Sequence, residues 1–423
     1  MRSSRNYYLL LGGQFLGAFG DNVLLKAILG PLTYLNTSGA ITQQEVNAQN
    51  SLFNAVFFVP FIVLAPLVGF LNDRMPKTSW LFGGNALKVF GTAVGLAGVW
   101  MNAGDFHASR HWQVVAYGLV AVGACVYSPA KYGILPEILP AERLVKANGT
   151  VEMLTLVAIL SGLISGATLY DHVRSLPVCY AACGGLYLLA LTLNGLMDRT
   201  PHNPASSFTH SLGEFGGSLW GLISHRRLGR ILLGSGLFWF SGAILRTNLQ
   251  AWGLEVYRQA GFAVAGITNE RLVGLMVGLI IGIVSGSVLA GQLHKTGDLR
   301  WARRYGFLMA CGILLLGLLG GRLGLALIVA VLVAAGLCGG LLVVPLNAAL
   351  QNESDHSRLG KTIAIQNFID YFFMLFGAGF LAGLTKLGAT PMQVFLALPV
   401  VLAVISLALR MPAAVRGAAS SPR

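Results

Sequence analysis

The stretch GFLNDRMPK, residues 69–77, is a short charged segment between two long apolar runs of the chain. One run covers residues 51–71 and the other covers residues 79–101. Each run has the roughly 20 mainly apolar residues that a helix needs to cross the hydrocarbon core of a bilayer. The segment is therefore predicted to be a tight loop that joins two membrane-spanning helices.

The composition of the whole chain also indicates a membrane protein. Of its 423 residues, 55% are hydrophobic and 11% are charged, whereas soluble domains carry about 25% charged residues. The 54 glycines suit helices that approach closely in lipid. Basic loops on one side of a membrane account for the net charge of +13, so we expect no nucleic-acid partner. The five cysteines lie in apolar runs without a CxxC pair, so we expect core residues and neither a metal site nor a cofactor.

Reading outward from the loop, we predict an all-α integral membrane protein with twelve spanning helices in two pseudo-symmetric six-helix bundles. The expected division is an N-terminal bundle at residues 1–197, a cytoplasmic linker at 198–228 and a C-terminal bundle at 229–423. Basic residues fall mainly in loops on the side of the N-terminus, which predicts that both termini and the linker are cytoplasmic. The predicted spans are residues 7–34, 51–71, 79–101, 112–138, 148–170, 177–197, 229–256, 270–293, 302–320, 323–350, 361–387 and 392–410.

The two halves show signs of a duplicated unit. FGDNVLLK at residues 19–26 can be laid over FSGAILRT at residues 240–247. In the same way, NGTVE at residues 148–152 can be laid over QNFID at residues 366–370. Both alignments bring charged residues of the two halves to similar depths, and internal repeats of this kind are common in transporters.

The loop at residues 69–77 resembles the G-x-L-x-D-R-x-G-R-K signature of the major facilitator superfamily, with Pro76 in place of the second glycine. In that superfamily the loop aspartate, here Asp73 followed by Arg74, is thought to hold the cytoplasmic gate closed by capping a helix of the other half. A carboxylate is favoured at a helix N-terminus, and the start of the eleventh predicted span, near Lys361, is the candidate partner. Alternatively, Asp73 caps only its own turn.

Several charged residues lie inside the predicted spans, where a charge is costly unless it meets water or a partner. Asp21 lies near the middle of the first span, Lys131 is on the fourth and Arg246 is on the seventh. Arg and Lys in an apolar cavity suit a phosphate or a carboxylate, while an acidic group suits an ammonium or a proton. As an alternative, Asp21 and Arg246 neutralise each other as a structural pair.

The other charged residues of the spans carry separate expectations. Glu152 and Asp370 are candidates for a gating network near the cytoplasmic side. Lys88 is more readily structural, because its helix is usually peripheral in this superfamily. Lys26 either tunes the outer mouth of a transport path or only extends toward the surface.

Five stretches together resemble the bacterial lysophospholipid transporters, a family of inner-membrane major facilitators: QFLGAFGDN (14–22), SPAKYGIL (128–135), FWFSGAILR (238–246), VVPLNAALQ (343–351) and AIQN (364–367). The resemblance implies movement of lysophospholipids, such as lysophosphatidylethanolamine, from the outer to the inner leaflet of the bacterial inner membrane. A cytoplasmic acyltransferase/acyl-carrier-protein synthetase, a possible functional partner, then re-acylates them. The headgroup is expected to meet the residues at charged or polar positions of the family motif: Asp21, Asn22, Lys131 and Arg246.

Three other functions are alternatives. A proton-coupled major facilitator that exports amphipathic drugs would use Asp21 as its proton carrier. A membrane-embedded enzyme such as the acyltransferase is disfavoured, because the nearest approach to a His-x4-Asp signature, His294 and Asp298, has three intervening residues. The sequence shows no nucleotide loop either. A lipid receptor would bind lysolipid without moving it across the bilayer.

Overall fold

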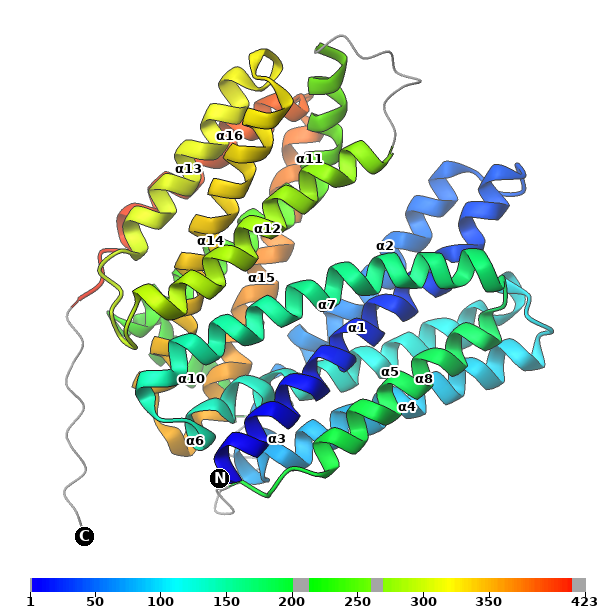
Figure 1. The fold of residues 1–423 in the computed structure, drawn as a ribbon, viewed down its shortest axis with the longest axis horizontal. Coiled ribbons are helices and arrows are strands. Elements are labelled where there is room, and N and C mark those ends of the chain that lie inside the picture. The colour runs from blue at the N-terminus through cyan, green and yellow to red at the C-terminus, as the bar shows by residue number, and fades with distance from the viewer. Residues whose placement is uncertain (1, 201–212, 260–268, 413–423) are drawn as a thin grey trace. The chain divides into compact units, whose positions relative to one another are not determined.

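The protein is described by a computed structural model that covers residues 2–200, 213–259 and 269–412 (Figure 1). Every regular element in these ranges is helical. Eleven of the described helices are long and apolar enough to cross a membrane. The predicted linker falls partly at residues 201–212, which lie outside the described residues. The fold is therefore the all-helical, multi-pass architecture that the apolar runs predict.

The chain forms two compact units, and each unit contains pieces of both sequence halves. Unit 1 consists of Met1–Leu139, Leu154–Glu214 and Asp355–Asn367, and unit 2 consists of Pro140–Met153, Phe215–Ser354 and Phe368–Arg423. Two long helices, α7 and α15, therefore begin in one unit and continue in the other. In both cases it is the first turns of the helix that belong with the other sequence half.

Unit 1 holds the first helices of the chain. They are α1 (Arg2–Thr37), α2 (Gln43–Val63), α3 (Ala65–Arg74), α4 (Lys77–Met101), α5 (Phe106–Gly133), α6 (Leu135–Ile138), the larger part of α7 (Leu144–Val173), and α8 (Leu176–Gly195). Of these, α4 is the helix predicted as the third span, and it is not among the eleven apolar helices. It instead carries buried polar side chains at Lys77, Asn85 and Lys88.

Unit 2 holds the later helices. They are α10 (Phe215–Ser224), α11 (Leu228–Gln259), α12 (Asn269–Leu293), α13 (Ala302–Leu319), α14 (Leu325–Glu353), most of α15 (Leu359–Lys386), and α16 (Pro391–Ala408). Short 3-10 turns precede α7, follow α13 and precede α15.

The helix predicted at residues 51–71 begins earlier than its apolar run and is interrupted near its end. It starts at Gln43 because Thr42 and Glu45 form a capping box, in which each side chain bonds the backbone N–H of the other. The residues between the cap and the apolar run are mainly polar, so a prediction from hydropathy places the start of the helix too late. The break at Leu64 precedes Pro66, which sits in the first turn of α3, a position that proline tolerates.

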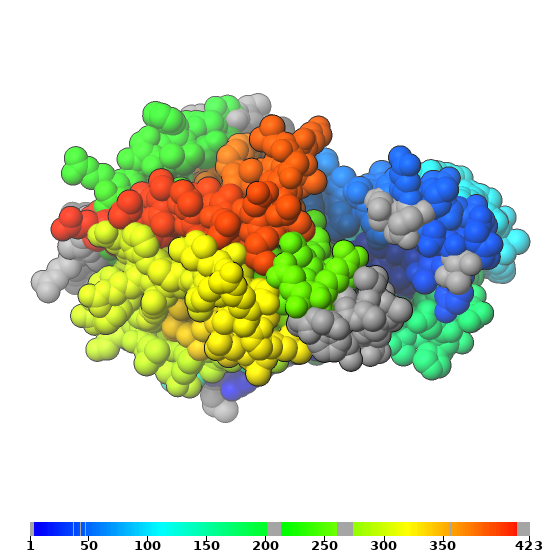
Figure 2. Space-filling model, turned by 90° about the horizontal axis from the view of Figure 1, so that it is seen from above, coloured from blue at the N-terminus to red at the C-terminus, as the bar shows by residue number. Residues whose placement is uncertain are grey.

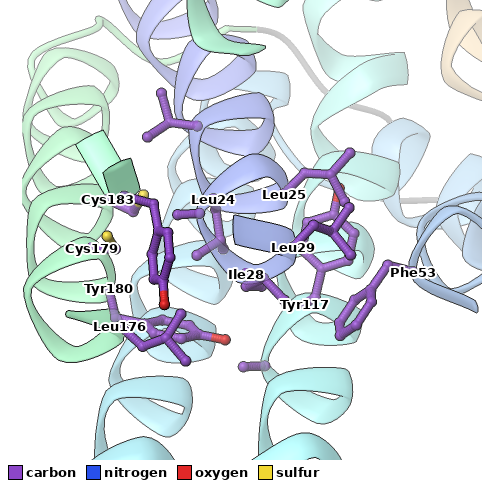
Figure 3. Packing of buried hydrophobic residues seen from close by; sticks show 14 of the residues in the cluster. Leu24, Leu25, Ile28, Leu29, Phe53, Tyr117, Leu176, Cys179, Tyr180 and Cys183 are labelled. Atoms are coloured by element: carbon purple, nitrogen blue, oxygen red, sulfur yellow. The ribbon is translucent and has the colours of Figure 1, made fainter. Parts of the chain in front are cut away.

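The core of unit 1 is a cluster of aliphatic and aromatic side chains from six helices, α1, α2, α4, α5, α7 and α8, part of which is drawn in Figure 3. Leu24 and Ile28 of α1 are fully buried and face Tyr180 and Cys183 of α8. On the other side of α1, Tyr117 of α5 lies edge-on to Phe53 of α2, with ring centroids 5.9 Å apart. The cluster holds α1 against α2, α5 and α8, which fixes the rotation of α1 about its axis.

In unit 2, small residues set how closely the helices approach. In Figure 2, α16 (red) packs against α13 (yellow). Between α12 and α14, Gly282 and Gly286 lie on the backbone of α14, and Gly336 and Gly340 lie on the backbone of α12. This spacing of four residues is the small-residue pattern that lets membrane helices touch along their backbones.

The close approach of α12 and α14 predicts that an added methyl group is not tolerated at Gly282. A Cβ there would overlap the Val333 carbonyl oxygen, so Gly282→Ala is expected to lower the free energy of unfolding by about 1–3 kcal/mol through overpacking. Thermal unfolding of the purified protein in detergent measures the loss. Gly274→Ala on the same helix is the control, because no described atom lies within 4 Å of its added Cβ. Equal stability of the two variants would contradict the packing argument.

Candidate functional site

Asp21, near the middle of α1, has a protein partner for each carboxylate oxygen. Lys88 of α4 places its Nζ 2.8 Å from Asp21 Oδ2, and the Tyr187 hydroxyl of α8 donates to Asp21 Oδ1 at 2.9 Å. Asp21 and Lys88 are 7% and 3% exposed, so the ion pair lies inside unit 1. The sequence leaves two alternatives for Asp21, contact with the substrate and a structural pair with Arg246. In unit 1 Asp21 forms an ion pair, and its basic member is Lys88.

Two further groups surround the Lys88 ammonium. The ring centroids of Tyr187 and Tyr127 lie 5.5 Å and 5.8 Å from Nζ, within the range of a cation–π interaction. Lys131 of α5 also interacts electrostatically with Asp21. One carboxylate and two ammonium groups therefore act on each other inside unit 1, with a formal sum of +1.

Glycines of α1 make room for this polar cluster. A Cβ on Gly20 would lie 2.8 Å from the Tyr187 ring, and a Cβ on Gly13 would overlap the amide of Asn194. Between them, Gly17 faces Asn85 Oδ1 and Lys88 Nζ. The sequence GGQFLGAFGD thus presents a flat face of α1 on which the side chains of α4 and α8 lie.

The other predicted binding residues of unit 1, Asn22 and Lys131, and the uncertain candidate Lys26 have different surroundings. Asn22 is half-buried and donates to the Ala18 carbonyl of its own helix at 2.8 Å, next to Gly162 of α7. Lys26 is exposed. Lys131, in the last turn of α5, is half-buried with its Nζ 4.3 Å from the Tyr132 ring centroid.

In unit 2, the predicted phosphate ligand Arg246 is on α11 and its side chain is exposed. Counted along the helix from Leu228, it is 246 − 228 = 18 residues in, or about 27 Å from that end at 1.5 Å per residue. Lys131, by contrast, is two residues before the end of its helix at Gly133. Arg246 is therefore near the middle of its own helix, whereas Lys131 is near the end of its own helix.

Asp73 makes the contact that the loop motif predicts. Its carboxylate accepts hydrogen bonds from the backbone N–H groups of Gly360 at 2.6 Å and Lys361 at 3.1 Å, in the first turn of α15. Gly69, one turn earlier on α3, lies against the Lys361 backbone. Burial raises the pKa of Asp73 from 3.8 to about 6, and the two backbone hydrogen bonds limit the rise. Arg74 is exposed, with its guanidinium 5.7 Å from the Phe70 ring centroid.

Two polar contacts beside Asp73 are not anticipated by the sequence patterns. Lys77 forms a buried ion pair with Glu137 of α6, and Asn367 of α15 donates to the Ser128 hydroxyl of α5 at 3.0 Å. The hydrogen bond from Asn367 to Ser128 joins the first turns of α15 to α5, and it lies one turn along α5 from Lys131. The start of α15 is thus held to unit 1 at two levels.

The start of α7 is held within unit 2 by a reciprocal pair of amides. Asn148 donates to Gln351 Oε1 at 2.8 Å, and Gln351 donates back to Asn148 Oδ1 at 2.9 Å. Both residues are fully buried. The next residue of α7, Gly149, lies directly on the Ser287 carbonyl of α12. The start of α15 in unit 1 is likewise held by a polar side chain and a close glycine contact. At α15 the polar group is a carboxylate, whereas at α7 it is a pair of amides.

The predicted gating carboxylates Glu152 and Asp370 are both buried in unit 2. Asp370 accepts a hydrogen bond from the Ser235 hydroxyl of α11 at 2.8 Å, and it interacts electrostatically with Glu152. The structure therefore brings the two residues of the repeat alignment into one cluster. Their part in gating stays a prediction.

No group of three or more metal-ligating side chains occurs in the part of the chain that the structure describes. The cysteines are unpaired thiols, and four of the five are buried. The polar chemistry of the described residues thus consists of ion pairs, amides and hydroxyl groups.

Comparison with known proteins agrees with this architecture. The family model of the Major Facilitator Superfamily matches residues 10–378. The lysophospholipid transporters LplT of Yersinia pestis (strain Pestoides F) and Yersinia pseudotuberculosis serotype O:3 (strain YPIII) are 32% identical over 396 residues, which cover 91% of this chain and 88% of theirs.

Solved structures show the same fold at low sequence identity. The human organic anion transporter MFSD10 has a TM-score of 0.72 at 14% identity and covers 97% of this chain and 100% of its own. The E. coli fucose:proton symporter FucP has a TM-score of 0.70 at 15% identity, over 97% of this chain and 99% of its own. At these identities the likeness extends to the fold alone.

The buried pair of Asp21 and Lys88 predicts strong coupling between the two residues. Lys88→Met leaves a buried carboxylate with only the Tyr187 hydroxyl, so we expect a loss of about 3–5 kcal/mol in stability. The double variant Lys88→Met/Asp21→Asn removes both charges and should regain most of that loss. Thermal unfolding in detergent reports both values. Additive effects of the two substitutions would show that the pair is not coupled.

The raised pKa of Asp73 predicts a pH-dependent contact with α15. The docked carboxylate holds its proton up to about pH 6, whereas a solvated one releases it near pH 4. Docking therefore strengthens as the pH falls through 6, by about tenfold between pH 7 and pH 5. Hydrogen exchange of the first turn of α15, corrected for intrinsic rates, measures this change.

Asp73→Asn should abolish that pH dependence. Asp298→Asn is the matched control, because Asp298 is a loop carboxylate that pairs with Arg300 and not with α15. A pH dependence that survives in Asp73→Asn would assign the effect to another group.

Proposed function

The chain belongs to the Major Facilitator Superfamily and, within it, to the family of bacterial lysophospholipid transporters, and on that premise we propose that it moves lysophospholipids across a bacterial inner membrane. It is a multi-pass membrane transporter and not an enzyme. The proposed direction is from the outer to the inner leaflet, by alternating access, for substrates such as lysophosphatidylethanolamine. A cytoplasmic acyltransferase would then consume the delivered lysolipid.

The observation that carries this proposal is a cation on each of two apolar helices, Arg246 near the middle of α11 and Lys131 near the end of α5. A lysophospholipid has one phosphate and one acyl chain, so it needs a cationic contact for its headgroup and an apolar surface for its tail. Arg246 suits a phosphate because its planar guanidinium can bind two oxygens at once. Lys131, beside the Tyr132 ring, offers a second, single-point contact.

The depths of the two cations support an order of events. With both termini on the cytoplasmic side, as the basic loops suggest, Arg246 lies nearer the outer face and Lys131 nearer the inner face. We place the phosphate first on Arg246 and later on Lys131, so that the charged headgroup is never left without a counter-ion. Asn22, on the first helix, would supply a polar contact to the glycerol or amine.

The internal pairing changes what we propose for Asp21. Both of its oxygens are bonded to Lys88 and Tyr187, so a substrate ammonium would have to displace Lys88 to reach it. We therefore assign Asp21 to the charge balance of the site rather than to direct contact with the headgroup. The cluster of Glu152 and Asp370, with Asp73 and Arg74 at the loop, remains our proposed gate.

Arg246→Ala is expected to abolish lysophospholipid movement while the protein still folds and inserts. Purified protein is reconstituted with labelled lysophosphatidylethanolamine, and transfer between leaflets is measured with and without ion gradients. Diacyl lipids serve as the substrate control. Arg258→Ala, which removes another exposed arginine of the same helix, serves as the protein control and should leave the rate unchanged.

Normal lysolipid transfer by Arg246→Ala would remove this residue from the mechanism. If the wild-type protein moves no lysolipid but moves amphipathic drugs along a proton gradient, the proposed substrate class is wrong.

A further inference from the structure

The short helix α10 directly precedes the spanning helix α11, and its two faces differ in composition. Apolar side chains recur every three or four residues, as on one face of an amphipathic helix: Phe215, Leu219, Leu222 and Ile223, with Trp220 at the edge. The opposite face carries only small residues: Gly217, Ser218, Gly221 and Ser224. The helix therefore has one apolar face and one face without large side chains.

Protein covers the apolar face of α10 at one end only. Phe215 is buried, and its ring lies edge-on to Phe368 of α15 with the centroids 6.0 Å apart. Trp220 and Ile223, further along the helix, are 72% and 47% exposed. No described atom lies within 4 Å of a Cβ added at Gly216, which lies between these two residues on the same face. The described chain thus leaves the outer edge of the apolar face uncovered.

A helix of this length and composition needs an external surface to be stable. Isolated helices shorter than about 12–15 residues are marginal in water, and α10 has 10 residues. Each glycine in a helix interior lowers the helical population about fivefold relative to alanine, and α10 contains Gly216, Gly217 and Gly221. Its stability must therefore come from burial of the apolar face.

The link to α11 places α10 at the boundary of the membrane. Ser224 ends α10 and Leu228 begins the spanning helix α11, so these residues are at most about 14 Å apart along the chain. Gly229 lies directly on the Ile223 carbonyl, which holds the end of α10 against the start of α11. His225 Nδ1 accepts a hydrogen bond from the Leu228 N–H at 3.1 Å. The surface next to α10 is therefore the lipid that surrounds α11.

Two consecutive arginines of the link have different surroundings. Arg227 is 4% exposed, and its guanidinium binds both carboxylate oxygens of Glu353, at the end of α14, at 2.6 Å and 2.7 Å. This buried ion pair fixes the link in unit 2. Arg226 is exposed, and a basic residue beside the end of a spanning helix suits the phosphates of anionic lipids.

We propose that α10 is an interfacial helix that lies in the plane of the membrane surface, in the leaflet where α11 begins. Trp220 and Ile223 insert at the boundary between headgroups and acyl chains, the depth at which tryptophan is enriched. The face of small residues meets water, and Arg226 contacts the phosphates of anionic phospholipids. The proposal uses none of the residues assigned to lysolipid movement, so it does not rest on the proposed function.

Hydrogen exchange of the full-length protein in nanodiscs that hold one chain each tests the insertion. Trp220→Gln removes the largest apolar group of the uncovered edge, so the amides of α10 should exchange about tenfold faster than in the wild type. Gly221→Ala is the matched control, because no described atom lies within 4 Å of its added Cβ. Its methyl group favours the helix, so exchange should slow by up to about fivefold.

Unchanged exchange of α10 in Trp220→Gln would overturn the proposal. Protection of α10 that appears only in nanodiscs holding two chains would also overturn it, because the cover would then be a second copy of the protein.

Lipids brominated on the acyl chain near the headgroup test the contact of Trp220 directly, because bromine quenches tryptophan fluorescence on contact. The difference between the wild type and Trp220→Phe gives the emission of this residue, which brominated lipid should quench. Trp252→Phe is the control, since Trp252 is fully buried and stacked on Phe395 with centroids 4.7 Å apart. If iodide in the aqueous phase quenches the Trp220 emission and brominated lipid does not, α10 lies in water and the proposal is wrong.

Lipid charge tests the contact of Arg226. In the wild type, α10 should exchange about fivefold more slowly in phosphatidylglycerol nanodiscs than in phosphatidylcholine nanodiscs, the effect of one basic residue near an anionic surface. Arg226→Gln should remove most of this difference. Arg258→Gln, which changes an exposed arginine in the last turn of α11, should keep it. An equal effect of lipid charge in the two variants would overturn the headgroup contact.

Discussion

The bond between the Asp21 carboxylate and the Lys88 ammonium is the constraint around which unit 1 is arranged. Hydrocarbon offers these charges no solvent, so α1 and α4 must keep a register in which the two groups meet. The Tyr187 hydroxyl extends the same requirement to α8. The glycines of α1 follow from it, because the long Lys88 side chain and the Tyr187 ring occupy the face where larger residues of α1 would lie. The ion pair and the small residues of α1 therefore depend on each other, because both need the same register of α1, α4 and α8.

The contacts at the starts of α15 and α7 differ from this ion pair in how readily their partners can be exchanged. Asp73 binds main-chain N–H groups of α15, so the contact depends on a helix being present and not on which side chains it carries. Asp73 also lies in the last turn of α3, at the end of the helix, where water can replace each partner when the contact opens. The pair of Asp21 and Lys88 has no such substitute inside the bilayer. Contacts at the helix ends can thus exchange with water, whereas the contact at mid-membrane must exchange with another ligand.

The sequence predicts what depends on local patterns. Apolar runs locate the spans, and the loop motif identifies the start of α15 as the partner of Asp73, because both signals lie within a few consecutive residues. The early start of α2 at Gln43 is missed, since a capping box in polar residues has no hydropathy signal. The role of Lys88 is missed for a stronger reason. Its depth can be counted along α4, but its partner depends on how α1 and α4 are rotated about their axes, and packing far along the chain sets that rotation. The amide pair of Asn148 and Gln351 escapes prediction for the same reason.

The charge balance inside unit 1 fixes the sign of any coupling between a proton and the substrate. Asp21, Lys88 and Lys131 sum to +1 when Asp21 is ionised and to +2 when it is protonated. One extra unit charge about 10 Å from a phosphate is worth roughly 1–2 kcal/mol at an effective dielectric constant of about 20. Because the phosphate is negative, this favours binding of the two ligands together, by about tenfold. If Asp21 takes up a proton, this sign of coupling predicts that the proton binds together with an anionic headgroup rather than in exchange for it.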